Sequence, residues 1–166
     1  MDKKTRQYIG LFSAIIAYYV IHEGAHLVYA LCIGVFKQIN FIGLGMQIDV
    51  YVEQMTMQQL GVFCIVGSIA TAIVAYVLVF WANKIKDLPS KWFKACMYYI
   101  TIAMLLIDPL YLSLLCGMFG GGDMNGIALL APEWVVSVVA VAVGALNAIL
   151  IWKVLYPAYT KSFAQN

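Results

Sequence analysis

The sequence has little charge and almost no histidine. Only 11% of its 166 residues are charged and only two are histidine, whereas 64% are hydrophobic and the mean hydropathy is +0.89. Soluble domains carry roughly 25% charged residues, so this composition predicts an integral membrane protein. A net charge of +2 is too small to indicate nucleic-acid binding. We therefore expect the chain to interact with the lipid bilayer and not with nucleic acid.

Paired cysteines are also missing. The four cysteines show no C-x-x-C spacing, and each lies in an apolar run: Cys32, Cys64, Cys96 and Cys116. This pattern is typical of small buried hydrophobic residues. It argues against a disulfide framework and against a thiolate zinc site.

Four hydrophobic runs are each long enough to cross a bilayer, which needs about 20 apolar residues. They cover approximately 8–35, 59–82, 95–118 and 133–156. The basic start of the chain is superficially similar to a signal peptide, but the first run is too long for one, and we expect a retained transmembrane helix. The sequence therefore predicts an all-α membrane protein with four transmembrane helices, in a single domain over residues 1–166.

Two segments between the runs are expected to be irregular. Residues 39–52 partly alternate between apolar and polar and contain glycines, which predicts a short polar β-hairpin or strand between helices 1 and 2. Glycines at 117–122 predict a turn before helix 4 that could re-enter the membrane. The second run carries Gly67, Thr71 and Ala75 at four-residue spacing, which indicates close helix packing but is also common in membrane helices generally.

The basic residues predict the orientation in the membrane. With four spans, Lys37 alone of the ten Lys and Arg residues lies on the opposite side, and Lys94 belongs to a basic loop between the second and third runs. By the positive-inside rule, both termini should be cytoplasmic. We expect a multi-pass protein of the plasma (cell) membrane.

The pattern His22-Glu23-Gly24-Ala25-His26 lies inside the first apolar run. On a helix, its two imidazoles share one face about one turn apart, which suits two neutral nitrogen ligands on one divalent metal. Glu23 can then act as general base toward a water at the metal. Ionisable groups at membrane depth cost a few kcal/mol each. Three within five residues therefore indicate a site, the alternative being a polar trio bonded between helices.

A catalytic metal needs a third protein ligand and an open position. Because the chain has no further histidine, that ligand must be a carboxylate, a cysteine or an amide. Asp108, in the third run, and Asp123, after three glycines, both lie at suitable depth. Each also has a plainer explanation, as a helix-packing hydrogen bond beside Pro109 or as a helix N-cap in an outer loop. Asn147, in the last run, is expected to bond between helices.

His-Glu-x-x-His in a membrane helix resembles the site-2 protease group of intramembrane zinc metalloproteases (the M50 peptidases). The stretch Gly122–Leu130 is similar to the segment that precedes the final span in the compact M50B-like branch. The resemblance implies a Zn²⁺ ion held by His22, His26 and Asp123, with Asp108 as the rival third ligand on depth. It also implies that the polar hairpin holds the substrate as an extended strand.

The activity that this resemblance implies is hydrolysis of peptide bonds in membrane-embedded or membrane-adjacent substrates, with Glu23 as the catalytic residue. The partner is then a membrane protein or peptide substrate. Two alternatives stay open: a non-catalytic metal-binding membrane protein, and a metal or proton carrier that uses His22, His26 and Asp108. A homo-oligomer also stays open, because a dimer could supply the symmetry that carriers show.

Overall fold

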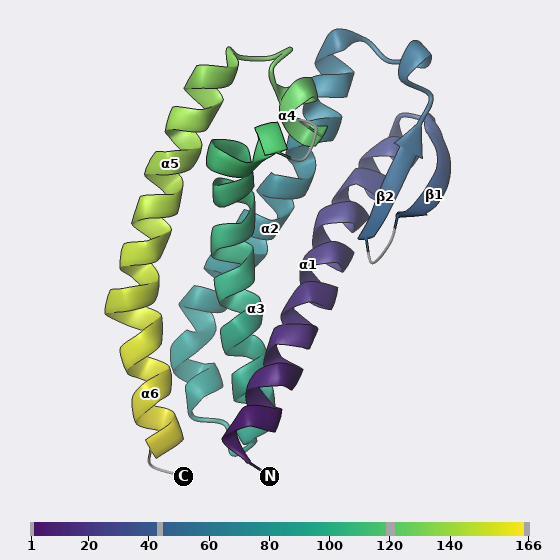
Figure 1. Ribbon diagram of the computed structural model, residues 1–166. Helices are drawn as coiled ribbons and strands as arrows, with labels where there is room; N and C mark the ends of the chain where they lie inside the picture. Colours follow the sequence, from purple (N-terminus) through teal and green to yellow (C-terminus); the bar gives the residue numbers. More distant parts are fainter. Residues whose placement is uncertain (1, 43–44, 119–121, 165–166) are drawn as a thin grey trace.

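The long helices run up and down beside one another (Figure 1). The computed structural model describes residues 2–42, 45–118 and 122–164. The long helices are α1 (Lys3–Cys32), α2 (Met57–Lys86), α3 (Lys91–Leu110) and α5 (Glu133–Leu150). All four are long and apolar enough to cross a membrane, counting the turns that extend α3 and α5. The prediction of four helices able to cross a membrane is therefore confirmed among the described residues. Both ends of the chain lie at the same end of the bundle (Figure 1).

The helices are longer than the apolar runs that predicted them. Asp2 caps α1 by accepting a hydrogen bond from the Thr5 amide at 2.7 Å, so the helix includes the polar start of the chain. At the other end, α5 continues through a π-helical turn (Ile151–Leu155) into α6 (Tyr156–Ala164). Pro157 does not end this helix. It follows directly on the π-helical turn, whose wider hydrogen-bonding pattern leaves room for a ring that would clash with the carbonyl four residues earlier in a regular α-helix.

The polar segment between α1 and α2 forms the expected hairpin. Gly34 adopts a left-handed conformation with φ of +75°, which ends α1 and turns the chain back. Strands β1 (Phe36–Ile42) and β2 (Gly45–Val50) then pair antiparallel, with Ile39 opposite Ile48. Figure 1 shows this hairpin lying along the upper half of α1. A 3₁₀ turn (Val52–Gln54) leads to α2.

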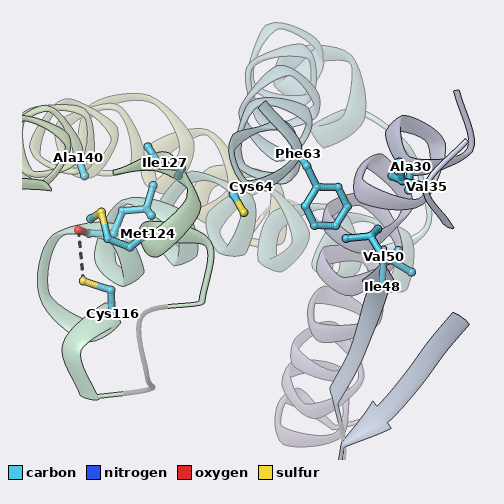
Figure 2. Packing of buried hydrophobic residues seen from close by; sticks show 11 residues of the cluster. Ala30, Val35, Ile48, Val50, Phe63, Cys64, Cys116, Met124, Ile127 and Ala140 are labelled. Atoms are coloured by element: carbon cyan, nitrogen blue, oxygen red, sulfur yellow. Dashed lines mark hydrogen bonds between the residues drawn. The ribbon is translucent and has the colours of Figure 1, made fainter. Parts of the chain in front are cut away.

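A cluster of buried apolar side chains fixes the hairpin and the chain before α5. Figure 2 shows Ile48 and Val50 of β2 directed toward Phe63 of α2. It also shows Met124 and Ile127 of the short helix α4 (Gly122–Ile127) beside one another. Both are 2% exposed. Burial of these apolar side chains holds β2 and α4 on opposite sides of α2.

The glycine-rich turn predicted before the fourth transmembrane helix, which is α5 in the structure, is only partly described. Residues 119–121 lie outside the described residues, as does the 43–44 turn of the hairpin. The chain then forms α4, which presses on α2 so closely that a Cβ on Gly126 would overlap Cys64 Sγ. This contact positions Asp123, which lies in the first turn of α4.

Candidate metal centre

His22 and His26 lie on the buried face of α1, as their spacing predicts. They are 6% and 3% exposed, and their ring centroids are 4.9 Å apart. Phe63 of α2 covers the second ring, with a centroid distance of 4.8 Å to His26. Two largely buried imidazoles therefore lie side by side on this face of α1.

Asp123 brings a carboxylate to the same point. Its Oδ2 lies 3.1 Å from Nε2 of His22 and 3.7 Å from Nε2 of His26. One ligand atom from each of the three residues lies within 4.8 Å of the others. Nitrogen and oxygen ligands at zinc–ligand distances of roughly 2.0–2.2 Å in a tetrahedron are about 3.3–3.6 Å apart. The cluster therefore has the donors and the spacing to hold a metal ion.

Gly67 of α2 faces both imidazoles. A Cβ at this position would lie 2.6 Å from Nε2 of His26 and 2.7 Å from Nε2 of His22. Any larger residue would therefore fill the place at which the two ring nitrogens converge. The small-residue stripe of α2 thus contributes space to the site as well as helix packing.

Glu23 borders the same site from the side of the hairpin. The amide of Ile48 donates a hydrogen bond to Glu23 Oε2 at 3.3 Å. Glu23, Asp123 and both histidines line one cavity of about 600 Å³, with residues 45–48 of β2 along another wall. The cavity is thus lined by the possible metal ligands, by the further carboxylate of Glu23 and by part of β2.

Asp108 lies behind His22, away from this cluster. It is 4% exposed, and its Oδ1 lies 3.2 Å from Nδ1 of His22, whereas Asp123 approaches Nε2 of the same ring. Tyr18 donates its hydroxyl hydrogen bond to Asp108 Oδ1 at 2.6 Å, and Thr71 donates to Oδ2. The two candidate aspartates therefore contact opposite nitrogens of one imidazole.

Sequence reasoning did not assign Tyr18, Gly67 or Thr71 to this site. The only indication in the sequence was a four-residue spacing along a helix, which is weak evidence for a site. Tyr18 is four residues before His22, so the two share a helix face, and Gly67 and Thr71 are four apart on α2. Contacts across three helices give these positions their roles, and a single helix pattern does not contain that information.

An ion pair outside the membrane-spanning helices joins the two strands of the hairpin. Lys37 Nζ lies 3.1 Å from Asp49 Oδ2. This hydrogen bond and the charge of Asp49 raise the pKa of Lys37 above its ordinary value. The pair links β1 to β2 near the register shift between Phe36 and Gln38.

The structure thus brings three of the predicted residues, His22, His26 and Asp123, to one point, with Glu23 beside them and Asp108 behind His22. A scan against models of protein families, a search of the curated proteins and a search of the solved structures found no match. The function must therefore follow from the chemistry of these side chains.

Proposed function

We propose that this chain is an intramembrane zinc metalloprotease of the M50 kind, which hydrolyses peptide bonds of membrane-embedded or membrane-adjacent substrates. One observation carries the proposal. Glu23 and the three possible ligands His22, His26 and Asp123 line the same cavity. A base next to a two-histidine, one-carboxylate donor set is the arrangement that metal-assisted hydrolysis requires.

The residues divide into ligands and a base. His22 and His26 would bind the ion through Nε2 and Asp123 through a carboxylate oxygen. Bound zinc would lower the pKa of water and polarise the scissile carbonyl. The donor set suits zinc and also other divalent ions.

Glu23 would take a proton from the attacking water and deliver it to the leaving amine. The Ile48 amide, which donates to Glu23 Oε2, holds the carboxylate at the edge of the cavity. A site that only stores or carries a metal has no need of this additional carboxylate. Glu23 therefore favours hydrolysis over the binding and carrier alternatives.

The position of β2 beside the cavity favours a peptide as the substrate. The Ile48 amide donates to Glu23, and residues 45–48 of β2 line the cavity. An extended peptide could pair with this strand, whereas the backbone of a helical substrate is shielded by its own hydrogen bonds. We propose that α4 re-enters the membrane from the outer side. Both termini would then lie on the cytoplasmic side of the plasma membrane, because most basic residues are on the same side as the termini.

The test compares Glu23→Gln with Glu53→Gln, which changes an exposed glutamate of the 3₁₀ turn after β2. We expect Glu23→Gln to bind zinc like the parent but to cleave a fluorescein-labelled single-span peptide in detergent about 10²- to 10⁴-fold more slowly, because the proton acceptor is lost. Glu53→Gln should match the parent in both measurements. Parent-like cleavage by Glu23→Gln would contradict the proposal.

A further inference from the structure

The two histidines differ at Nδ1, the ring nitrogen away from Asp123. This atom has polar partners in His22 but none among the described residues in His26. Nδ1 of His22 lies 3.2 Å from Asp108 Oδ1 and 3.3 Å from the hydroxyl of Tyr18. Among the residues that the structure describes, Nδ1 of His26 is buried without a hydrogen-bond partner. The two histidines of one motif are therefore supported in different ways.

Asp108 is itself held by partners from two other helices. Tyr18 of α1 donates to its Oδ1, and Thr71 of α2 donates to its Oδ2. With the Nδ1 hydrogen of His22, the carboxylate would have three donors, which is what a buried carboxylate needs. To reach the cluster at Nε2, Asp108 would have to give up all of them and pass the imidazole ring. Its contacts therefore argue against a role as the third ligand.

A neutral imidazole carries one N–H and one free lone pair. If Nδ1 donates its hydrogen to Asp108, the lone pair of His22 lies on Nε2, the atom that is 3.1 Å from Asp123 Oδ2. Hydrogen bonds of this kind, from the far nitrogen of a ligating histidine to a carboxylate, fix the tautomer and the ring orientation in metal sites.

We propose that Asp108 is a positioning residue of the metal site: it accepts the Nδ1 hydrogen of His22 and so directs Nε2 at the metal, while Tyr18 and Thr71 hold the carboxylate in place. This inference rests on the proposed metal centre but not on its proteolytic activity. It assigns the third-ligand position to Asp123 and gives the buried Asp108 a separate task.

The experiment measures zinc affinity by competition with a chelating dye, on full-length protein in detergent without a histidine tag. We expect Asp108→Ala to bind one zinc ion per chain with about 10- to 100-fold lower affinity, the usual effect of losing such a partner. Asp108→Asn keeps an oxygen acceptor, so it should lose only about 3- to 10-fold. Asp123→Ala should lose stoichiometric zinc binding, because a ligand is removed.

A second measurement reports the tautomer directly. The chain has only two histidines, so ¹⁵N-histidine labelling gives a spectrum of two rings, which His26→Ala assigns. In the zinc-loaded parent, we expect a proton on Nδ1 of His22 that exchanges slowly with solvent. In Asp108→Ala this proton should exchange faster, a change that a purely packing role of Asp108 would not cause.

Three results would overturn the inference. The first is parent-like zinc affinity in Asp108→Ala or, if that variant does not fold, in Asp108→Asn. The second is loss of stoichiometric zinc from Asp108→Ala while Asp123→Ala keeps it, which would make Asp108 the ligand. The third is a zinc-loaded His22 with its proton on Nε2. If the affinities follow the expected order but no peptide is cleaved, the proposed protease fails and the positioning role stands.

Discussion

The two halves of the helix bundle both bury polar side chains, but they use them differently. In the half with the hairpin and α4, which we call the site half, Glu23, Asp123 and two histidines line an open cavity. In the half with both chain ends, the terminal half, Lys94 of α3 is 0% exposed. Its Nζ donates to Ser162 of α6 at 2.8 Å, and Ser162 in turn donates to the carbonyl of Lys86 at 2.5 Å.

This comparison separates two uses of buried polarity in a membrane protein. The terminal half surrounds its ammonium group with a hydroxyl and with the ring of Phe163, whose centroid is 5.6 Å away. That arrangement joins α6 to α2 and α3. The site half directs its ligand atoms at a shared space. The buried polar groups of this bundle therefore have two uses: they join helices in the terminal half and place possible ligand atoms at a cavity in the site half.

The largest effect is expected on zinc affinity, when a methyl group is added beside the two histidines of the site half. Gly67→Ala places a methyl group where both Nε2 atoms converge, so we expect zinc affinity to fall by about 100-fold, at the upper end of the effects of disturbing ligand orientation. Gly24→Ala is the matched control, because its Cβ would meet no described atom within 4 Å. Dye competition measures both. Equal affinities in the two variants would show that Gly67 does not define the site.

An intermediate effect is expected in the terminal half. Ser162→Ala removes the hydroxyl that accepts from the buried Lys94, and hydrogen bonds to charged groups contribute about 1.5–3 kcal/mol. We expect the free energy of unfolding to fall by about that amount in detergent, with zinc affinity unchanged. Ser13→Ala, which loses only a 3.4 Å contact with Cys96 Sγ, should be milder. A weaker zinc site in Ser162→Ala would break the separation between the halves.

The smallest effect concerns the exposed ion pair of the hairpin. Asp49 raises the pKa of Lys37 in the folded chain above its ordinary value of 10.5. The ion pair therefore stabilises the fold fully at pH values below that ordinary pKa. Its contribution is lost as the pH rises through the higher, folded-state pKa. Asp49→Asn should therefore lower the thermal midpoint slightly at pH 8, and the difference from the parent should shrink at pH 11. A difference that grows with pH would exclude the ion pair as its cause.

The sequence predicted the elements well because their signals are local. Apolar runs of membrane length became four helices, and the alternating segment became the hairpin. Asn147 was expected to bond between helices and does so. Its Nδ2 donates to the Leu105 carbonyl at 2.7 Å, and its Oδ1 accepts from the Tyr76 hydroxyl at 2.8 Å. A lone amide in an apolar helix has few other options.

The arrangement around the site could not be predicted in the same way. Sequence position gives the depth of Asp108 and Asp123 along the membrane normal, but not the direction in which each side chain points around its helix. That direction depends on how α3 packs on α1 and on where α4 returns to α2. Lys94 shows the same limit. It was grouped with a basic loop, yet it is buried because α6 continues past Pro157 and covers it.

The left-handed turn at Gly34 has a consequence for the order in which the site is built. It returns the chain along α1 at once, so Glu23 and Ile48 meet across only 25 positions. His22 and Asp123 are 101 positions apart. During synthesis, the first helix and its hairpin can therefore assemble well before α4 has been made. On the proposed function, the ribosome-bound chain would carry its base and two histidines without a complete metal site, and it would stay inactive while its own spans enter the membrane.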